Sequence, residues 1–274
     1  MLLEARNVTK VFGGRRSRSA VRAVDDVTLR AEPGRFVAIV GESGSGKSTL
    51  ARILLGLMPA SSGEVTLDGA PVGRLRGEDG RAFRRSVQAV LQDPSGSLNP
   101  RKTVARAIGE VIRLHRIERT DDGVRSRVRT VLEQVGMTPA EVFLDRFPHE
   151  LSGGQRQRVL IARALALEPR IIIADEAVSA LDASVKAGVL RVMVDIKERL
   201  GIGYVFITHD LPVVRKVADD VYVMKDGAVV EQGDKAAVLG DPQHPYTRTL
   251  LAAAPELDRA ADGEDSINNQ SEGR

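Results

Sequence analysis

A glycine-rich segment between an apolar run and a helical pattern constrains the fold of this chain most strongly. The segment Gly41–Thr49 reads GESGSGKST; the apolar run Phe36–Val40 precedes it and the helix-compatible stretch Leu50–Leu55 follows it. This is the spacing of a P-loop, whose glycines let backbone N–H groups and the positive end of the helix converge on phosphate oxygens. Strand, loop and helix in this order predict an α/β protein that binds a nucleotide. The predicted phosphate-binding residues are Gly41, Ser43, Gly44, Gly46, Lys47, Ser48 and Thr49.

A second apolar run ends in two carboxylates. Ile171–Ala174 has the composition of a buried strand, and Asp175 and Glu176 follow it directly. Because ligands bind at the carboxyl ends of strands in open α/β sheets, we expect both carboxylates beside the P-loop. Asp175 suits coordination of Mg²⁺ together with the Ser48 hydroxyl, and Glu176 suits polarising the water that attacks the γ-phosphate. Alone, such a pair is also typical of a solvated strand end, but beside a P-loop it predicts nucleotide hydrolysis.

Alternating polar and apolar residues predict a second sheet. Residues 1–35 and 61–69 contain such segments, which are typical of antiparallel strands beside the parallel core. The pair Asp226-Gly227 lies between two strand-like runs and favours a β-hairpin. We expect this hairpin to add to the antiparallel part of the fold.

The strand patterns fade between about residues 93 and 150. Residues 104–114 and 124–135 carry helix-compatible apolar spacing, which predicts a helical insertion. Residues 257–274 are polar, with almost no large apolar side chains, and are expected to form a disordered tail. The expected fold class is therefore α/β: a P-loop NTPase core with a parallel sheet, an antiparallel β subdomain and a helical subdomain.

Composition narrows the class of protein further. Lys and Arg total 40 against 37 Asp and Glu, a formal net charge of +3, which gives no argument for nucleic-acid binding. The chain has no cysteine, which excludes disulfides and thiolate metal sites and fits a reducing compartment. No stretch approaches the roughly 18 consecutive apolar residues of a membrane span. We therefore expect another chain to cross any membrane that this one serves.

A third segment narrows the range of protein families to which the chain could belong. Leu151–Gln155 reads LSGGQ, and Ser152 is placed to cap the helix-compatible stretch after it, leaving glycine N–H groups free to meet an anion. With this pentapeptide as their signature segment, the ABC ATPases are the family that the chain resembles over most of its length. Their other segments occur in the expected order. Gln92 falls at the glutamine loop, Ser179–Asp182 at the D-loop, and His209 resembles the switch histidine.

The resemblance implies a head-to-tail dimer in which ATP bound at Lys47 of one subunit is covered by the signature segment of the other. ATP and Mg²⁺ are the implied cofactors. Phe12 is a candidate for stacking on adenine, where the family often has Tyr; the alternative is a core aromatic of the first sheet. The implied catalytic residues are Glu176, His209 and Gln92. The implied Mg²⁺ ligands are Ser48, Gln92 and Asp175. The implied nucleotide contacts outside the P-loop are Phe12, Ser152, Gly154 and Gln155.

Two further stretches resemble the peptide and nickel importer branch of the ABC transporter ATP-binding subunits. Gln92–Pro94 leads to Leu98–Arg101, and His244–Arg248 reads HPYTR near the C-terminus. The branch implies that the chain powers import of di- or oligopeptides or a related small solute, with nickel left open. Ala177-Val178 departs from the Pro-Thr that most ABC ATPases carry there, although this form occurs in the same branch.

The branch also implies partners and an organisation. We expect two multi-span permease subunits, a second ABC ATPase (a copy of this chain or, preferably, a paralogue) and, indirectly, an external solute-binding protein, but no nucleic acid. The expected location is peripheral, on the cytoplasmic face of the cell membrane. The expected domain covers residues 1–256, with the helical insertion at about 93–150 and a peptide-importer-type segment at about 233–256, followed by the tail.

Two other functions compete with import. A soluble ABC ATPase accessory to carbon–phosphorus bond cleavage is the closest alternative, because such proteins resemble the same branch. ABC ATPases that act on DNA or ribosomes would show long coiled-coil insertions, zinc-ligand cysteines or a second cassette, and this sequence has none of these.

Overall fold

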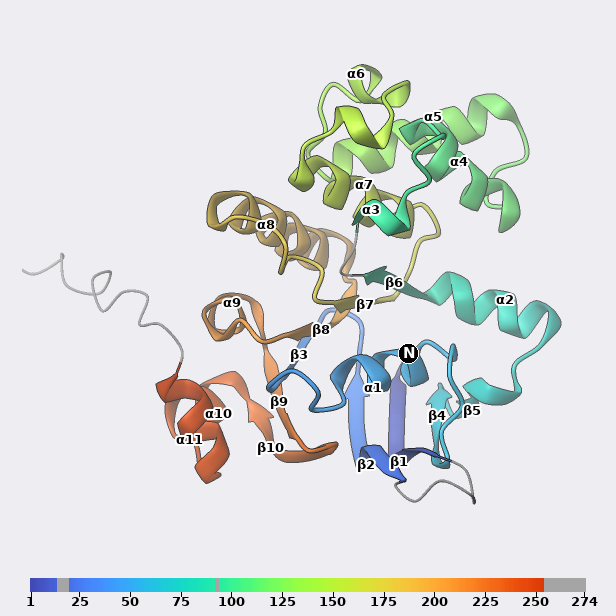
Figure 1. The fold of residues 1–274 in the computed structure, drawn as a ribbon. Helices are drawn as coiled ribbons and strands as arrows, with labels where there is room; N and C mark the ends of the chain where they lie inside the picture. Colours follow the sequence, from blue (N-terminus) through green and yellow to red (C-terminus); the bar gives the residue numbers. More distant parts are fainter. Residues whose placement is uncertain (14–19, 92–93, 254–274) are drawn as a thin grey trace, which may run out of the picture.

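The computed structural model describes residues 1–13, 20–91 and 94–253 and consists of two sheets with helices packed around them (Figure 1). The larger sheet has six strands in the order β10-β9-β3-β8-β7-β6, of which only β10 runs antiparallel to its neighbour. Its strands are β3 (Phe36–Val40), β6 (Val87–Leu91), β7 (Ile171–Asp175), β8 (Gly203–Thr208), β9 (Asp220–Lys225) and β10 (Ala228–Asp234).

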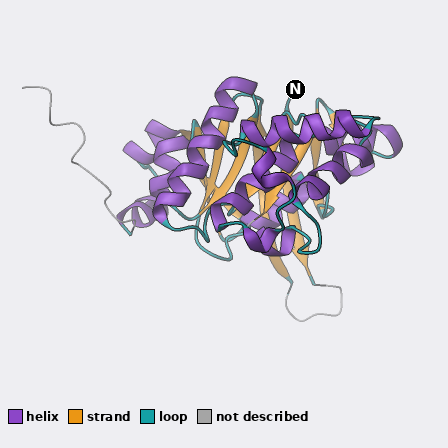
Figure 2. Cartoon of the chain, turned by 90° about the horizontal axis from the view of Figure 1, so that it is seen from above, coloured by secondary structure: helices purple, strands orange, loops and turns teal. Residues whose placement is uncertain are grey.

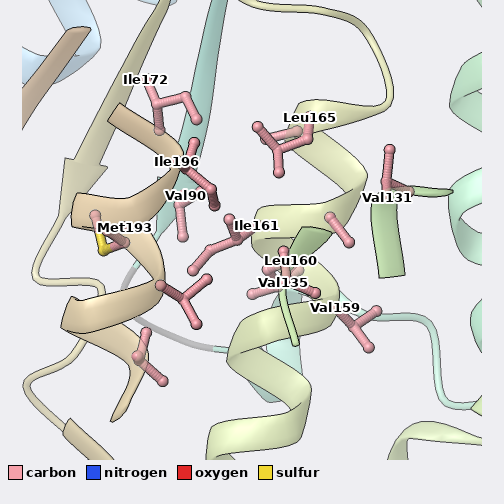
Figure 3. Packing of buried hydrophobic residues seen from close by; sticks show 14 of the residues in the cluster. Val90, Val131, Val135, Val159, Leu160, Ile161, Leu165, Ile172, Met193 and Ile196 are labelled. Carbon is pink, nitrogen blue, oxygen red and sulfur yellow. The ribbon is translucent and has the colours of Figure 1, made fainter. Parts of the chain in front are cut away.

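Both faces of the six-stranded sheet are covered, which explains the continuous apolar runs of its central strands. On one face lie α7 (Gly153–Leu165) and α8 (Ala183–Leu200), and Ile161, Met193 and Val90 belong to the same buried cluster (Figure 3). On the other face lies α1 (Lys47–Leu54), whose Leu50 and other apolar residues join a second cluster. Seen from above, helices lie over the strands (Figure 2).

The smaller sheet is antiparallel and has the order β2-β1-β4-β5. Its strands are β1 (Leu3–Phe12), β2 (Val21–Ala31), β4 (Ser62–Leu67) and β5 (Ala70–Pro71). The inward-facing residues of β1 and β2 share the apolar cluster of α1, so this sheet closes the second face of the core. The predicted antiparallel sheet is confirmed.

The hairpin at Asp226-Gly227 forms, but its expected place was wrong. Asp226 and Gly227 have φ of 49° and 88°, as a tight hairpin turn between β9 and β10 requires. Because β9 pairs in parallel with β3, both strands of the hairpin belong to the six-stranded sheet and not to the antiparallel one.

A helical layer covers α7 on the side away from the sheet (Figure 1). The described part of residues 94–150 forms helices and turns and no strand. Its elements are α3 (Pro94–Ser97), α4 (Val104–Leu114), α5 (Asp121–Gln134), α6 (Glu141–Leu144) and the 3₁₀ helix η2 (Pro148–Glu150). The remaining elements are η1 (Val72–Arg74), α2 (Gly77–Ser86), α9 (Leu211–Val217), α10 (Lys235–Gly240) and α11 (Pro245–Ala252).

Parallel core, antiparallel sheet and helical layer together confirm the expected fold class. Within the described ranges, every helix is too short or too polar to cross a membrane. The expected tail, residues 257–274, lies outside the described residues.

Candidate nucleotide-binding site

The P-loop joins β3 to α1 and curls around the ammonium group of Lys47. Lys47 is the first residue of α1, and its Nζ donates to the carbonyl oxygens of Gly41 (2.8 Å) and Glu42 (2.6 Å) and to Ser45 Oγ (3.2 Å). Only 5% of Lys47 is exposed. Burial lowers the pKa of the Lys47 ammonium, and the nearby carboxylates, led by Glu176, oppose this shift. The cation is therefore held inside the loop by backbone oxygens.

Two glycines of the loop are required by close backbone approaches. A Cβ on Gly41 would lie 2.1 Å from the carbonyl oxygen of Met224, and one on Gly46 would lie 2.1 Å from that of Ala23. Both glycines also have positive φ, 152° and 100°. Gly46 precedes the first residue of α1, so the loop delivers its backbone to the positive end of the helix.

Ser48 and Asp175 meet at the carboxyl end of β7. Ser48 Oγ donates to Asp175 Oδ1 at 3.0 Å, and burial raises the pKa of the Asp175 carboxyl. The pair offers a hydroxyl and a carboxylate oxygen, the hard donors that Mg²⁺ prefers. Among the described residues, no group of three or more His, Asp or Glu side chains could enclose a metal ion. This donor set fits Mg²⁺, which takes few protein ligands and completes its shell with phosphate and water.

Glu176 and His209 face each other at the same edge of the sheet. Glu176 follows β7, and His209 follows the neighbouring strand β8. His209 Nδ1 lies 3.4 Å from Glu176 Oε1. The parallel pairing of β7 with β8 explains the meeting, because Asp175 lies opposite Ile207 and the chain then leaves both strands at one edge. The backbone N–H of Glu176 donates to the Ile207 carbonyl at 2.9 Å, and Glu176 adopts a positive φ of 48°.

The signature segment forms the beginning of α7, as the sequence indicates. Gln155 N donates to Ser152 Oγ (3.2 Å) and Ser152 N donates to Gln155 Oε1 (2.9 Å), which is a reciprocal capping box. A Cβ on Gly154 would lie 2.3 Å from Val185 Cγ1, so glycine lets α7 approach the first turn of α8. Ser152, Gly154 and Gln155 line a cavity of about 330 Å³ between these two helices and the segment that follows α5.

The structure does not bring the signature segment to the P-loop of the same chain. The helices α1 and α7 pack on opposite faces of the sheet (Figure 1), and among the described residues no hydrogen bond joins Ser152 to Lys47. This separation agrees with the expectation that a second cassette supplies the cover.

The other predicted site residues are placed as follows. Phe12 ends β1 and is 41% exposed, with Lys10 Nζ 5.4 Å from its ring centroid, so it is not a core aromatic. Ser43 and Gly44 are exposed on the loop, and Thr49 is partly buried in α1. Gln92 lies outside the described residues.

One neighbour of the loop was not predicted. The hydroxyl oxygen of Tyr246, in α11, accepts a hydrogen bond from the backbone N–H of Glu42 at 3.1 Å. The HPYTR stretch marked a branch of the family, but no local pattern relates residues so far apart in the chain.

Family models match two regions of the chain. Residues 24–179 match the family described as "ABC transporter", and residues 230–273 match "Oligopeptide/dipeptide transporter, C-terminal region". The first match contains the P-loop, the signature segment and the acidic strand end. The second contains the HPYTR stretch.

Curated relatives are longer than this chain. The glutathione import ATP-binding protein of Salmonella typhimurium strain LT2 is 46% identical over 238 residues, which cover 87% of this chain and 38% of the relative. Its counterpart in Escherichia coli strain K12 is 47% identical over 235 residues, covering 86% of this chain and 37% of the relative. The chain thus spans somewhat over a third of the length of these relatives.

Solved structures share the fold. The dimeric ATP-binding cassette MJ0796 bound to ADP and Pi matches with a TM-score of 0.73 and 31% identity, covering 85% of this chain and 98% of that one. CbiO1 from Clostridium perfringens, part of an ABC transporter complex, matches with a TM-score of 0.75 and 29% identity, covering 87% and 90%. With this fold, the P-loop and the two family matches, the chain belongs to the ABC transporter family as an ATP-binding cassette that carries the C-terminal region of oligopeptide/dipeptide transporters.

Proposed function

We propose that this cassette binds and hydrolyses ATP to power the import of a di- or oligopeptide, or a related small solute, through membrane subunits. The observation that carries the proposal is the convergence of Ser48, Asp175 and Glu176 with the P-loop at the carboxyl edge of the parallel sheet. The C-terminal match to oligopeptide/dipeptide transporters supports a peptide-like solute. The curated relatives are named for import of glutathione, itself a small peptide.

The loop and its lysine would bind the phosphates. Lys47 is a buried point charge, held by the carbonyl oxygens of Gly41 and Glu42, that would bind oxygens of the β- and γ-phosphates. Ser48 and Asp175 would hold Mg²⁺, with Gln92 as a further expected ligand. When bound, this ion neutralises charge on the phosphate oxygens.

Glu176 would act on the attacking water. Its carboxylate lies at the strand end beyond Asp175, where it accepts a proton from water as the general base. His209, whose Nδ1 lies 3.4 Å from Glu176 Oε1, would contact the γ-phosphate and keep it aligned with the Glu176 carboxylate. The two carboxylates would thus have different roles: Asp175 would coordinate Mg²⁺, and Glu176 would accept the proton of the attacking water.

A second cassette would complete the site. ATP bound at the P-loop of the partner would be covered by Ser152, Gly154 and Gln155. Phe12 would stack on the adenine ring of the bound ATP. Closing on ATP excludes water and assembles the catalytic groups, so hydrolysis would alternate with opening. The dimeric form of the related cassette supports this arrangement.

Membrane subunits would be the other partners of this cassette. Two multi-span permease subunits would form the pathway, an external solute-binding protein would deliver the solute, and this cassette would attach peripherally at the cytoplasmic face. The partner ATPase would be a paralogue or a second copy. An accessory role in carbon–phosphorus bond cleavage is not favoured, because the C-terminal match is to transporters and the relatives are named as import proteins.

Solute uptake by cells tests the proposal. In a strain lacking the gene, we expect wild-type protein to restore uptake of labelled di- and oligopeptides and Lys47→Ala to restore none, because that change removes the charge that neutralises the phosphates. Lys216→Ala, which removes an exposed lysine of α9, serves as the matched control and should restore uptake fully. Unchanged peptide uptake in the deletion strain would contradict peptide import.

A further inference from the structure

The C-terminal segment reaches the P-loop through one hydroxyl group. Glu42 N donates to Tyr246 Oη at 3.1 Å, across 204 positions of sequence. Tyr246 is only 8% exposed, so its side chain is packed in the fold and not a mobile surface group. The contact links α11 directly to the loop that would bind the phosphates.

The same peptide unit is held at its other end by Lys47. The carbonyl of Gly41 and the N–H of Glu42 belong to one planar peptide unit, and Gly41 O accepts from Lys47 Nζ at 2.8 Å. Gly41 has a φ of 152°, which glycine adopts without a steric penalty but side-chain-bearing residues rarely adopt. Because Gly41 has no side chain, its ψ torsion, about which this peptide unit turns, is weakly restricted, and the Tyr246 hydroxyl adds a restraint on the unit.

Tyr246 is itself fixed by the strand pair beneath it. The Glu231 carboxylate in β10 accepts from the backbone N–H groups of Gln243 (2.7 Å) and His244 (3.1 Å). His244 Nδ1 accepts from Tyr246 N at 3.1 Å and so caps α11. Lys225 Nζ at the end of β9 lies 5.0 Å from the centroid of the Tyr246 ring. The hydroxyl is thus presented to the P-loop from a rigid support.

We infer that Tyr246 is a positioning residue for nucleotide binding: its hydroxyl orients the Gly41–Glu42 peptide unit and thereby the place at which Lys47 is held. The inference rests on the proposed binding of ATP at this loop. This role would explain the HPYTR stretch in physical terms. The stretch that resembles the peptide and nickel importer branch would then help to support the nucleotide site. Since the hydroxyl does not touch the reacting atoms, it affects ATP affinity and not the chemical step.

Tyr246→Phe is the direct test, because it removes the hydroxyl and keeps the ring. We expect the Kd and the KM for ATP to rise about fivefold, the usual size of one lost neutral hydrogen bond, with kcat at saturating ATP unchanged. Tyr204→Phe is the matched control: the Tyr204 ring is 1% exposed, and its hydroxyl has no hydrogen-bond partner among the described residues. This control should leave ATP affinity unchanged.

Glu231→Ala is the second variant, since it keeps Tyr246 and removes its support. We expect a rise of ATP KM in the same direction and of smaller size, again with kcat retained. Wild-type ATP affinity in Tyr246→Phe, or a lower Tm with unchanged affinity, would overturn the inference alone. Failure of the wild-type protein to bind ATP would overturn the proposed function and this inference with it.

Discussion

At the residue scale, two adjacent carboxylates differ in their surroundings, and the difference supports the separate roles proposed for them. Asp175 accepts a hydrogen bond from Ser48 and is buried enough that the pKa of its carboxyl is raised. Glu176 leaves the strand with a positive φ and turns toward His209. The Asp175 side chain therefore faces the P-loop helix, and the Glu176 side chain faces His209.

Glu176→Gln separates binding from hydrolysis. We expect ATP affinity to stay within about twofold and ATP turnover to fall by a factor of about 100 or more, because an amide cannot accept the proton of the attacking water. Calorimetric ATP binding and a phosphate-release assay measure the two quantities. Glu198→Gln, on the exposed face of α8, controls for the loss of a carboxylate. Near-normal turnover in Glu176→Gln would move the base to another residue.

We expect Asp175→Asn to remove a proposed Mg²⁺ ligand and to stabilise the nucleotide-free fold. Burial raises the pKa of Asp175, so the folded protein disfavours the ionised form that prevails at neutral pH, and the fold bears this cost. In nucleotide-free protein with the metal removed by EDTA, we expect the variant to raise Tm at pH 7. Thermal unfolding measures this, and a lowered Tm would show that the charge stabilises the fold.

At the element scale, the sequence predicted those parts whose signals are local. The buried strands β3 and β7 and the beginning of α7 were predicted because apolar runs, glycines and a capping serine each act within a few residues. The hairpin at Asp226-Gly227 was recognised, but its sheet was not, since the partner of β9 is β3, far away in sequence.

In the nucleotide-binding site, too, local sequence signals predicted some contacts and missed those between distant residues. Asp175 and Glu176 were predicted beside the P-loop from a rule on strand ends, and the structure brings Ser48 to Asp175 and His209 to Glu176. The contact of Tyr246 with the P-loop depends on how α11 returns to β9 and β10, which no local pattern encodes.

Ser152→Ala tests the capping box at the beginning of α7. The variant loses the side-chain acceptor for Gln155 N, which costs about 1 kcal/mol, or about 2–4 °C in Tm for a domain of this size. Ser126→Ala, at an exposed position within α5, is the matched control and should not lower Tm, because alanine favours a helix interior at least as well as serine does. Thermal unfolding followed by circular dichroism measures both variants. An unchanged Tm in Ser152→Ala would mean that water replaces the cap.

At the scale of the whole molecule, the fold keeps the signature segment away from the P-loop of its own chain. The P-loop helix and the signature helix lie on opposite faces of the six-stranded sheet, so one chain does not cover its own nucleotide. Two cassettes arranged head to tail would cover two sites at once. Opening and closing of such a pair is the movement that the helical layer above α7 would pass to membrane partners.

The most direct test of this account is purification of tagged Glu176→Gln protein from host membranes in the presence of ATP, followed by mass spectrometry of every chain that accompanies it. Because this variant should bind ATP without turning it over, the closed assembly should persist through purification. We expect a second ABC ATPase, or a second copy of this chain, together with two multi-span permeases. Recovery of soluble phosphonate-processing enzymes or ribosomal proteins, without any permease, would contradict it.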